Sequence, residues 1–263
     1  LTGAFLPLVL AVAMDLAWRP ETLLGAGWAL WVMAQAALMV LAALWFARQG
    51  GGIRLGLAAV AAYGLIALAL TLSLTEAALT LSLAVLMLTA ALLDRQRNLP
   101  ELGWVIGAGT MALGWRMLAD PGLLALLSGD LGIFDTLLTL AGCLGGPLLA
   151  LWLMRPLAPH PARRWGLFIT ETGLLCLAPV ALLVLLARFL PGLSAHATLG
   201  IEASALLLAS YVQYRRRALA EGQGRWLSRL RLVLAVLFGS AGTLVLCVGM
   251  TLFAPVWGDN WLR

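Results

Sequence analysis

The chain is a succession of apolar runs, each about as long as a helix that crosses a bilayer, separated by short polar segments. A membrane-spanning helix needs about 20 consecutive apolar residues. Strands are not expected, because the apolar residues do not alternate with a period of two. About nine runs qualify, and the predicted spans are 3–18, 23–46, 54–72, 75–93, 102–119, 132–154, 166–190, 197–214 and 231–254.

The third and fourth of these spans come from one continuous stretch. Residues 53–93 are apolar without an intervening loop, which is too long for one crossing and long enough for two. We place the turn near Ser73–Thr75, so that Glu76 lies close to the membrane surface.

The overall composition supports a membrane location. Hydrophobic residues make up 62% of the 263 residues and charged residues only 11%, with a mean hydropathy of +0.98. A soluble domain has about 45–50% apolar and about 25% charged residues, so soluble, secreted and disordered classes are excluded. The expected fold class is an all-α, polytopic integral membrane bundle that forms a single transmembrane domain over residues 1–263.

The basic residues indicate an orientation. All 17 are arginines, and thirteen of them fall in the connections after the second, fourth, sixth and eighth spans. Since cytoplasmic loops are enriched in basic residues, these connections are predicted to be cytoplasmic, with the N-terminus cytoplasmic and the C-terminus external. The net charge of +5 then reflects topology rather than nucleic-acid binding. Anionic lipid head groups are the expected partners of a basic, lipid-facing segment at Arg215, Arg216, Arg217 and Arg225.

Small residues and prolines are placed where they affect helix packing. Three glycine pairs have the GxxxG spacing that lets helix backbones approach closely, and we interpret them as packing sites within the chain. Prolines in the middle of the sixth and seventh predicted spans are expected to kink their helices. These positions are Gly52/Gly56, Gly103/Gly107, Gly142/Gly146, Pro147 and Pro179.

The sequence contains no recognisable catalytic, metal-binding or cofactor-binding motif. The predicted topology places His160 and His196 on opposite membrane faces, too far apart to share a ligand. Cys143, Cys176 and Cys247 lie in separate apolar runs without a CxxC pair, so no disulfide is expected. We therefore expect no catalytic residues, no metal and no cofactor.

One group of charged residues is predicted to gather at the outer membrane surface. Arg116 and Asp120 are spaced i,i+4 at the end of the fifth span, and Asp135 opens the sixth. Glu202 lies about 7 Å into the eighth span, and Arg188 ends the seventh. Charged residues inside spans usually pair with one another or mark a functional site. Both interpretations remain open for this outer cluster, defined as Arg116, Asp120, Asp135, Glu202 and Arg188.

Three segments resemble one bacterial membrane family, catalogued as domain of unknown function 2339. The segments are FLPLVLAVAMDLAWRPETLLGAGWALWVMAQAALMVLAALWFARQGG, WRMLADPGLLALLSGDLGIFDTLLTLAGCLGGPLLALWLMRP and GIEASALLLASYVQYRRRAL. Arg116, Pro121, Glu202 and Arg215 match the family pattern, whereas Asp120 and Asp135 stand where the family usually has Asn, and Gln213 replaces a Glu. The resemblance implies a multi-pass protein of the bacterial inner membrane and a fragment or reduced member of a longer family. It brings no known activity.

Three functions are compatible with these features. The first is a non-catalytic structural or accessory subunit of a larger membrane assembly, whose partners would be other membrane proteins. The second is a transporter or flippase-like carrier with an outer charged site, which requires a water-filled cavity and broken helices. The third is a membrane-embedded transferase that acts on a lipid-linked substrate, which requires an acid without an ion-pair partner.

Overall fold

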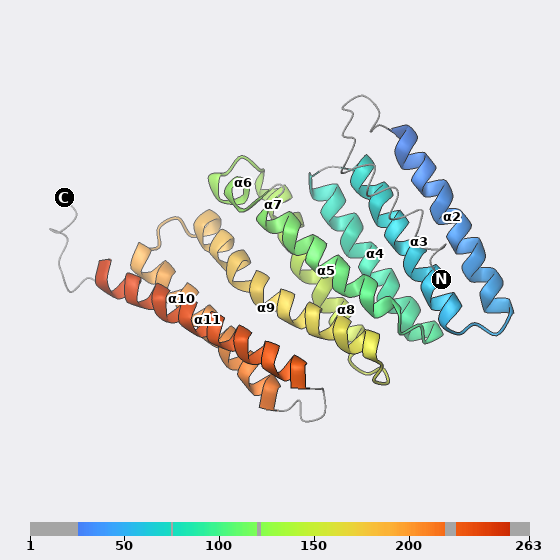
Figure 1. Cartoon of the computed structure of the whole chain (residues 1–263). Coiled ribbons are helices and arrows are strands. Elements are labelled where there is room, and N and C mark those ends of the chain that lie inside the picture. The colour runs from blue at the N-terminus through green and yellow to red at the C-terminus, as the bar shows by residue number, and fades with distance from the viewer. Residues whose placement is uncertain (1–25, 75, 120–121, 219–224, 253–263) are drawn as a thin grey trace. The chain divides into compact units, whose positions relative to one another are not determined.

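A computed structural model of the chain describes residues 26–74, 76–119, 122–218 and 225–252 (Figure 1). These residues form helices and connecting turns, with no strand among them, and this confirms the all-α class. The helices are α2 (Ala26–Arg48), α3 (Ile53–Ser73), α4 (Glu76–Arg97), α5 (Leu102–Leu118), α6 (Gly122–Ser128), α7 (Ile133–Leu140), the π-helical turn η1 (Ala141–Gly145), α8 (Gly146–Met154), α9 (Pro161–Phe189), α10 (Ala195–Ala218) and α11 (Arg225–Leu252).

Seven helical segments in this part of the chain are long and apolar enough to cross a membrane. They correspond to the second, third, fourth, sixth, seventh, eighth and ninth predicted spans. The first predicted span, 3–18, lies outside the described residues. The fifth corresponds to α5, whose 17 residues rise only about 26 Å, short of the roughly 30 Å hydrocarbon core. A count of nine crossings is therefore not confirmed.

The predicted division of residues 53–93 is confirmed. Helix α3 ends at Ser73 and α4 begins at Glu76, as the continuous apolar stretch had indicated. Helix α9 begins earlier than the predicted residue 166. Pro161 suits the first helical position, and His160 Nδ1 accepts a hydrogen bond from the Ala162 amide at 3.3 Å. The connection before α9 is therefore shorter than the sequence suggested.

The backbone hydrogen-bond pattern changes from α-helical to π-helical between α7 and α8. The π-helical turn η1 comes directly before α8, which has Pro147 in its first turn. Proline has no amide hydrogen, and its ring collides with the carbonyl four residues earlier. The wider π turn accommodates both effects, so the irregularity falls where Pro147 was expected to disturb the helix. Pro179 lies inside the continuous helix α9.

The chain divides into two compact units, Leu1–Leu174 and Leu175–Arg263, which we call unit 1 and unit 2. The division falls within α9, one turn before Pro179. In unit 1, α4 packs against α3, α5, α7, η1 and α8. In unit 2, α10 and α11 form an extensively packed pair.

The connections α2–α3, α4–α5 and α8–α9 lie at the same end of unit 1 (Figure 1). We call this the arginine-rich end, because it carries Arg48, Arg54, Arg95, Arg97, Arg155, Arg163 and Arg164. The clustering agrees with the grouping of arginines read from the sequence.

Glycine pairs bring the helices of unit 1 into backbone contact. A Cβ atom on Gly103 would lie 2.5 Å from the carbonyl oxygen of Ala162, and one on Gly166 would lie 2.9 Å from the carbonyl carbon of Gly103. A Cβ atom on Gly146 would lie 2.8 Å from that of Ala84. The Gly103/Gly107 pair therefore packs α5 on α9, and the Gly142/Gly146 pair packs the η1–α8 segment on α4. Both pairs are confirmed as packing sites within the chain.

Candidate functional site

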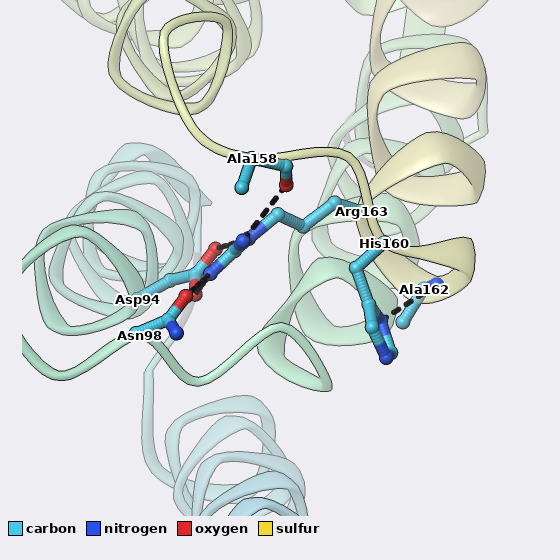
Figure 2. Close-up of polar contacts among 6 residues, drawn as sticks. All are labelled: Asp94, Asn98, Ala158, His160, Ala162 and Arg163. Carbon is cyan, nitrogen blue, oxygen red and sulfur yellow. Dashed lines mark hydrogen bonds and ion pairs between the residues drawn. The ribbon is translucent and has the colours of Figure 1, made fainter.

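The most completely bonded polar cluster lies at the arginine-rich end of unit 1, where α4 meets the start of α9 (Figure 2). Arg163 Nε donates to Asp94 Oδ2 at 2.7 Å, and Arg163 Nη2 donates to Asp94 Oδ1 at 2.6 Å. Nη2 also donates to Asn98 Oδ1 at 2.7 Å, and Nη1 donates to the Ala158 carbonyl at 2.9 Å. We call these four residues the Arg163 clamp.

The two charged residues of the clamp are buried, and the turn at Asn98 directly follows α4. The side chain of Arg163 is 3% exposed and that of Asp94 is 0% exposed. Asn98 follows α4 in the left-handed region at φ 54°, and its amide donates to the Asp94 carbonyl at 2.8 Å. This conformation is tolerated by Asn and directs the chain out of the helix. The fork geometry of the guanidinium suits the carboxylate, so the bonds fix α4 against α9.

The position of Asp94 along the chain is only a weak indication of this clamp. Asp94 lies in the last turn of α4, where the negative end of the helix dipole disfavours an acid unless a cation is close. Arg163 belongs to the arginine pattern that predicts a cytoplasmic connection, and this pattern does not identify Asp94 as its partner. Their separation of 69 residues explains why local spacing could not connect them.

Two further polar contacts join helices within unit 1. Thr110 Oγ1 of α5 lies 3.2 Å from Thr170 Oγ1 of α9, and both hydroxyls are buried. At the arginine-rich end, Arg155 Nη2 lies 3.4 Å from Glu171 Oε1, with the Arg155 side chain 52% exposed. The threonine contact is shielded from solvent, whereas the Arg155–Glu171 pair is partly exposed. Solvent therefore weakens the ion pair more than the threonine contact.

The members of the predicted outer cluster are found in both units. Arg116 is buried on α5, and its Nε donates to Thr80 Oγ1 of α4 at 3.4 Å. Asp135 lies half-buried in the first turn of α7, where the helix dipole favours an acid. Asp120 falls outside the described residues. Glu202 and Arg188 belong to unit 2. Convergence of the cluster remains a prediction.

Glu202 is buried on α10 of unit 2, with 8% of its surface exposed. Its Oε1 makes no hydrogen bond within the described part of the chain. Elsewhere in the same unit, Arg231 Nη1 donates to Gln213 Oε1 at 3.3 Å, which pairs two buried polar groups that the sequence did not connect. Glu202 is therefore the sequence-predicted residue whose carboxylate retains a free acceptor.

The helices extend further into the basic segment than the predicted spans, which end at residue 214 and begin again at residue 231. Arg215, Arg216 and Arg217 form the last turn of α10, and Arg225 begins α11, so only residues 219–224 lie between the described helix ends. Arginine is a good helix former and is favoured at a helix C-terminus. The Arg215 guanidinium lies 5.9 Å from the centre of the Tyr211 ring, and Arg217 Nε donates to Ser228 Oγ at 3.4 Å.

Among the residues that the structure describes, no group of three His, Cys, Asp or Glu side chains is arranged to hold a metal ion. Cys143, Cys176 and Cys247 are free thiols. His160 Nδ1 accepts a hydrogen bond from the Ala162 amide at the start of α9, and His196 Nδ1 lies 3.3 Å from the Gly249 carbonyl oxygen in unit 2.

Comparison with protein-family models, with curated proteins and with solved structures finds no match for this chain.

Proposed function

We propose that the chain is a non-catalytic, multi-pass membrane protein that serves as a structural or accessory subunit of a larger membrane assembly. The Arg163 clamp carries the proposal. A buried arginine and a buried aspartate are costly groups to place in a membrane protein, and here their bonds join α4 to the start of α9 and to the connection before it.

Uneven burial of the helices supports a role in assembly. In the membrane-spanning part of α4, 50% of the residues are buried, and in the α7–α8 segment 56% are. The corresponding share is 17% in α2, α10 and α11. Large apolar side chains such as Leu30, Leu208 and Leu244 are more than 60% exposed on these helices. Such faces suit lipid or the helices of a partner, and the proposal assigns part of them to a partner.

We also propose a bacterial inner-membrane location with the arginine-rich end of unit 1 in the cytoplasm. The clustering of arginines at one end supports this orientation. The resemblance to the family of domain of unknown function 2339 supports the location, through Arg116, Pro121, Glu202 and Arg215. Membership of that family is likewise a proposal.

Tryptophan scanning of α10 tests the subunit role. Ser204, Leu208 and Tyr211 are exposed on this helix, and Trp at a lipid-facing position should be tolerated. We expect wild-type protein in lipid nanodiscs to show a fixed stoichiometry with a partner by native mass spectrometry. Trp at one subset of these positions should dissociate the partner while the protein stays folded.

The scan has an internal control. Ala209 is only 3% exposed, so Ala209→Trp should disrupt folding itself. If the wild-type protein is a monomer in nanodiscs, and Trp is tolerated at every exposed position, the subunit role is wrong.

Glu202 favours a second candidate function, a transporter or flippase-like carrier. An intramembrane acid with a free acceptor oxygen is a recurrent feature of substrate and proton pathways. Under the subunit proposal the carboxylate only reduces stability, and Glu202→Met should raise the free energy of unfolding by about 1–3 kcal/mol. The measurement is unfolding in mixed detergent–SDS micelles.

The matched variant Glu202→Gln separates the two functions. It keeps the size of the side chain and removes its charge. A variant that folds normally but abolishes substrate movement in proteoliposomes would favour the carrier. Lower stability of Glu202→Met would show instead that the carboxylate has a structural partner.

A further inference from the structure

An apolar groove of about 340 Å³ lies in unit 1 between α3, α4 and α5. Its lining is apolar except for the polar tips of Tyr63 and Trp104. Small residues, including Ala67 and Ala108, form part of the wall and leave the space open. No polar cluster described above lines this groove, so it needs a separate explanation.

The groove covers the depth of one leaflet. Trp104 is the third residue of α5, and Ala112 lies eight residues later, about 12 Å deeper along the helix. On α3, Ala67 lies about 21 Å from Ile53 at the arginine-rich end. The groove thus extends from the arginine-rich end to just beyond the middle of a hydrocarbon core about 30 Å thick.

The lining of the groove suits a lipid acyl chain. Its walls are apolar side chains and small residues from three helices, which expose almost no polar surface to it. An extended acyl chain matches this apolar lining.

The charges at the mouth indicate which lipid is held. Arg54 is the second residue of α3 and Arg97 the last residue of α4, so both lie at the arginine-rich end, and both side chains are exposed. Trp104, the lining residue nearest the start of α5, lies at the same end, and Glu101 is an acid directly before α5. Trp104 stacks with Trp165 at 6.2 Å, which adds the amphipathic rings typical of a membrane interface. Two arginines against one acid attract an anionic head group.

We propose that this groove holds one acyl chain of an anionic phospholipid whose head group lies against Arg54 and Arg97. The site is independent of the subunit role. It would retain this lipid in preference to a zwitterionic one, and it would fill the space between α3 and α5 that the chain's own side chains leave open.

Photocrosslinking in proteoliposomes tests the acyl-chain site. The probes are phosphatidylglycerol and phosphatidylcholine that carry a diazirine on one acyl chain, and peptide mass spectrometry locates the adducts. Adducts on α3 and α5 should concentrate at residues 60–67 and 104–112. Ala108→Leu should lower them about tenfold, the loss expected when roughly two buried methylene groups of the lipid are displaced.

Ala37→Leu is the matched control, because Ala37 is an exposed alanine on α2 outside the groove. It should leave the adducts unchanged. Ala67→Leu fills the same groove from α3 and replaces Ala108→Leu if that variant does not fold. Equal adduct yields in the filling and control variants would overturn the site, as would adducts spread evenly over all exposed helix faces.

The head-group contact is tested separately by the double substitution Arg54→Gln and Arg97→Gln. In the wild type, the anionic probe should give more groove adducts than the zwitterionic probe. The substitutions should bring the two yields to parity without abolishing either. An unchanged preference for the anionic probe would contradict the head-group assignment.

Discussion

Replacing Arg163 with alanine should lower the free energy of unfolding by about 3–5 kcal/mol, the cost of leaving a buried charge without its partner. Asp94 is 0% exposed and would lose both of its guanidinium bonds. Asn98 and the Ala158 carbonyl would lose theirs as well. Unfolding in mixed detergent–SDS micelles measures the difference. Arg163→Lys should recover only part of it, because an ammonium lacks the planar fork that bonds both oxygens.

Arg155→Ala is the matched control for this prediction. The Arg155–Glu171 pair lies at the same end of unit 1, but its bond is 3.4 Å long and the arginine is half exposed. Its removal should cost less than about 1 kcal/mol. Similar losses for Arg155→Ala and Arg163→Ala would show that the clamp is no stronger than a surface ion pair.

Gly166→Val should destabilise unit 1 by at least about 1–3 kcal/mol, the typical cost of overpacking. A Cβ atom on Gly166 would lie 2.9 Å from the backbone carbonyl carbon of Gly103, and backbone atoms cannot rotate away as a side chain can. Helices α5 and α9 would have to separate, which would also strain the Thr110–Thr170 contact and the start of α9 that carries Arg163. The same unfolding assay measures this loss.

Gly200→Ala should instead raise the free energy of unfolding. Gly200 is also inside a helix, but a Cβ atom there would meet nothing within 4 Å. Alanine restricts the unfolded chain and favours the helix, so a gain of about 0.5–1 kcal/mol is expected. A destabilising Gly200→Ala together with a neutral Gly166→Val would contradict the assignment of close packing to α5 and α9.

The helices could be predicted from the sequence because length and hydropathy determine them locally. The turn at Ser73–Thr75 followed from the length of one apolar stretch, and the π-helical turn before Pro147 lies where a kink is predicted. The glycine pairs also gave two correct packing sites, since close approach of backbones requires small residues. Helix α9 begins before the predicted residue 166 because Pro161 suits the first helical position, although the segment that follows it is polar.

The polar contacts could be predicted only in part. Glu202 is predicted to be an acid inside a span, and the structure buries it. The partners of Arg163 and Arg231 did not follow from the sequence, because pairing across helices depends on how each helix is rotated in the bundle. Arg163 lies 69 residues from Asp94, and Arg231 lies 18 residues from Gln213. Both arginines belong to the charge pattern that predicts the topology, and both also make contacts between helices.

The most direct test of the account is the double substitution Asp94→Leu with Arg163→Met. If the clamp is structural, replacing both charges with apolar side chains should recover most of the stability lost in the single variants, since such replacement of a buried pair is often neutral or stabilising. The double variant should also keep the stoichiometry of the wild-type protein in nanodiscs. A double variant that folds with wild-type stability, yet loses its partner or a transport activity, would show that the clamp acts in function rather than in holding α4 against α9.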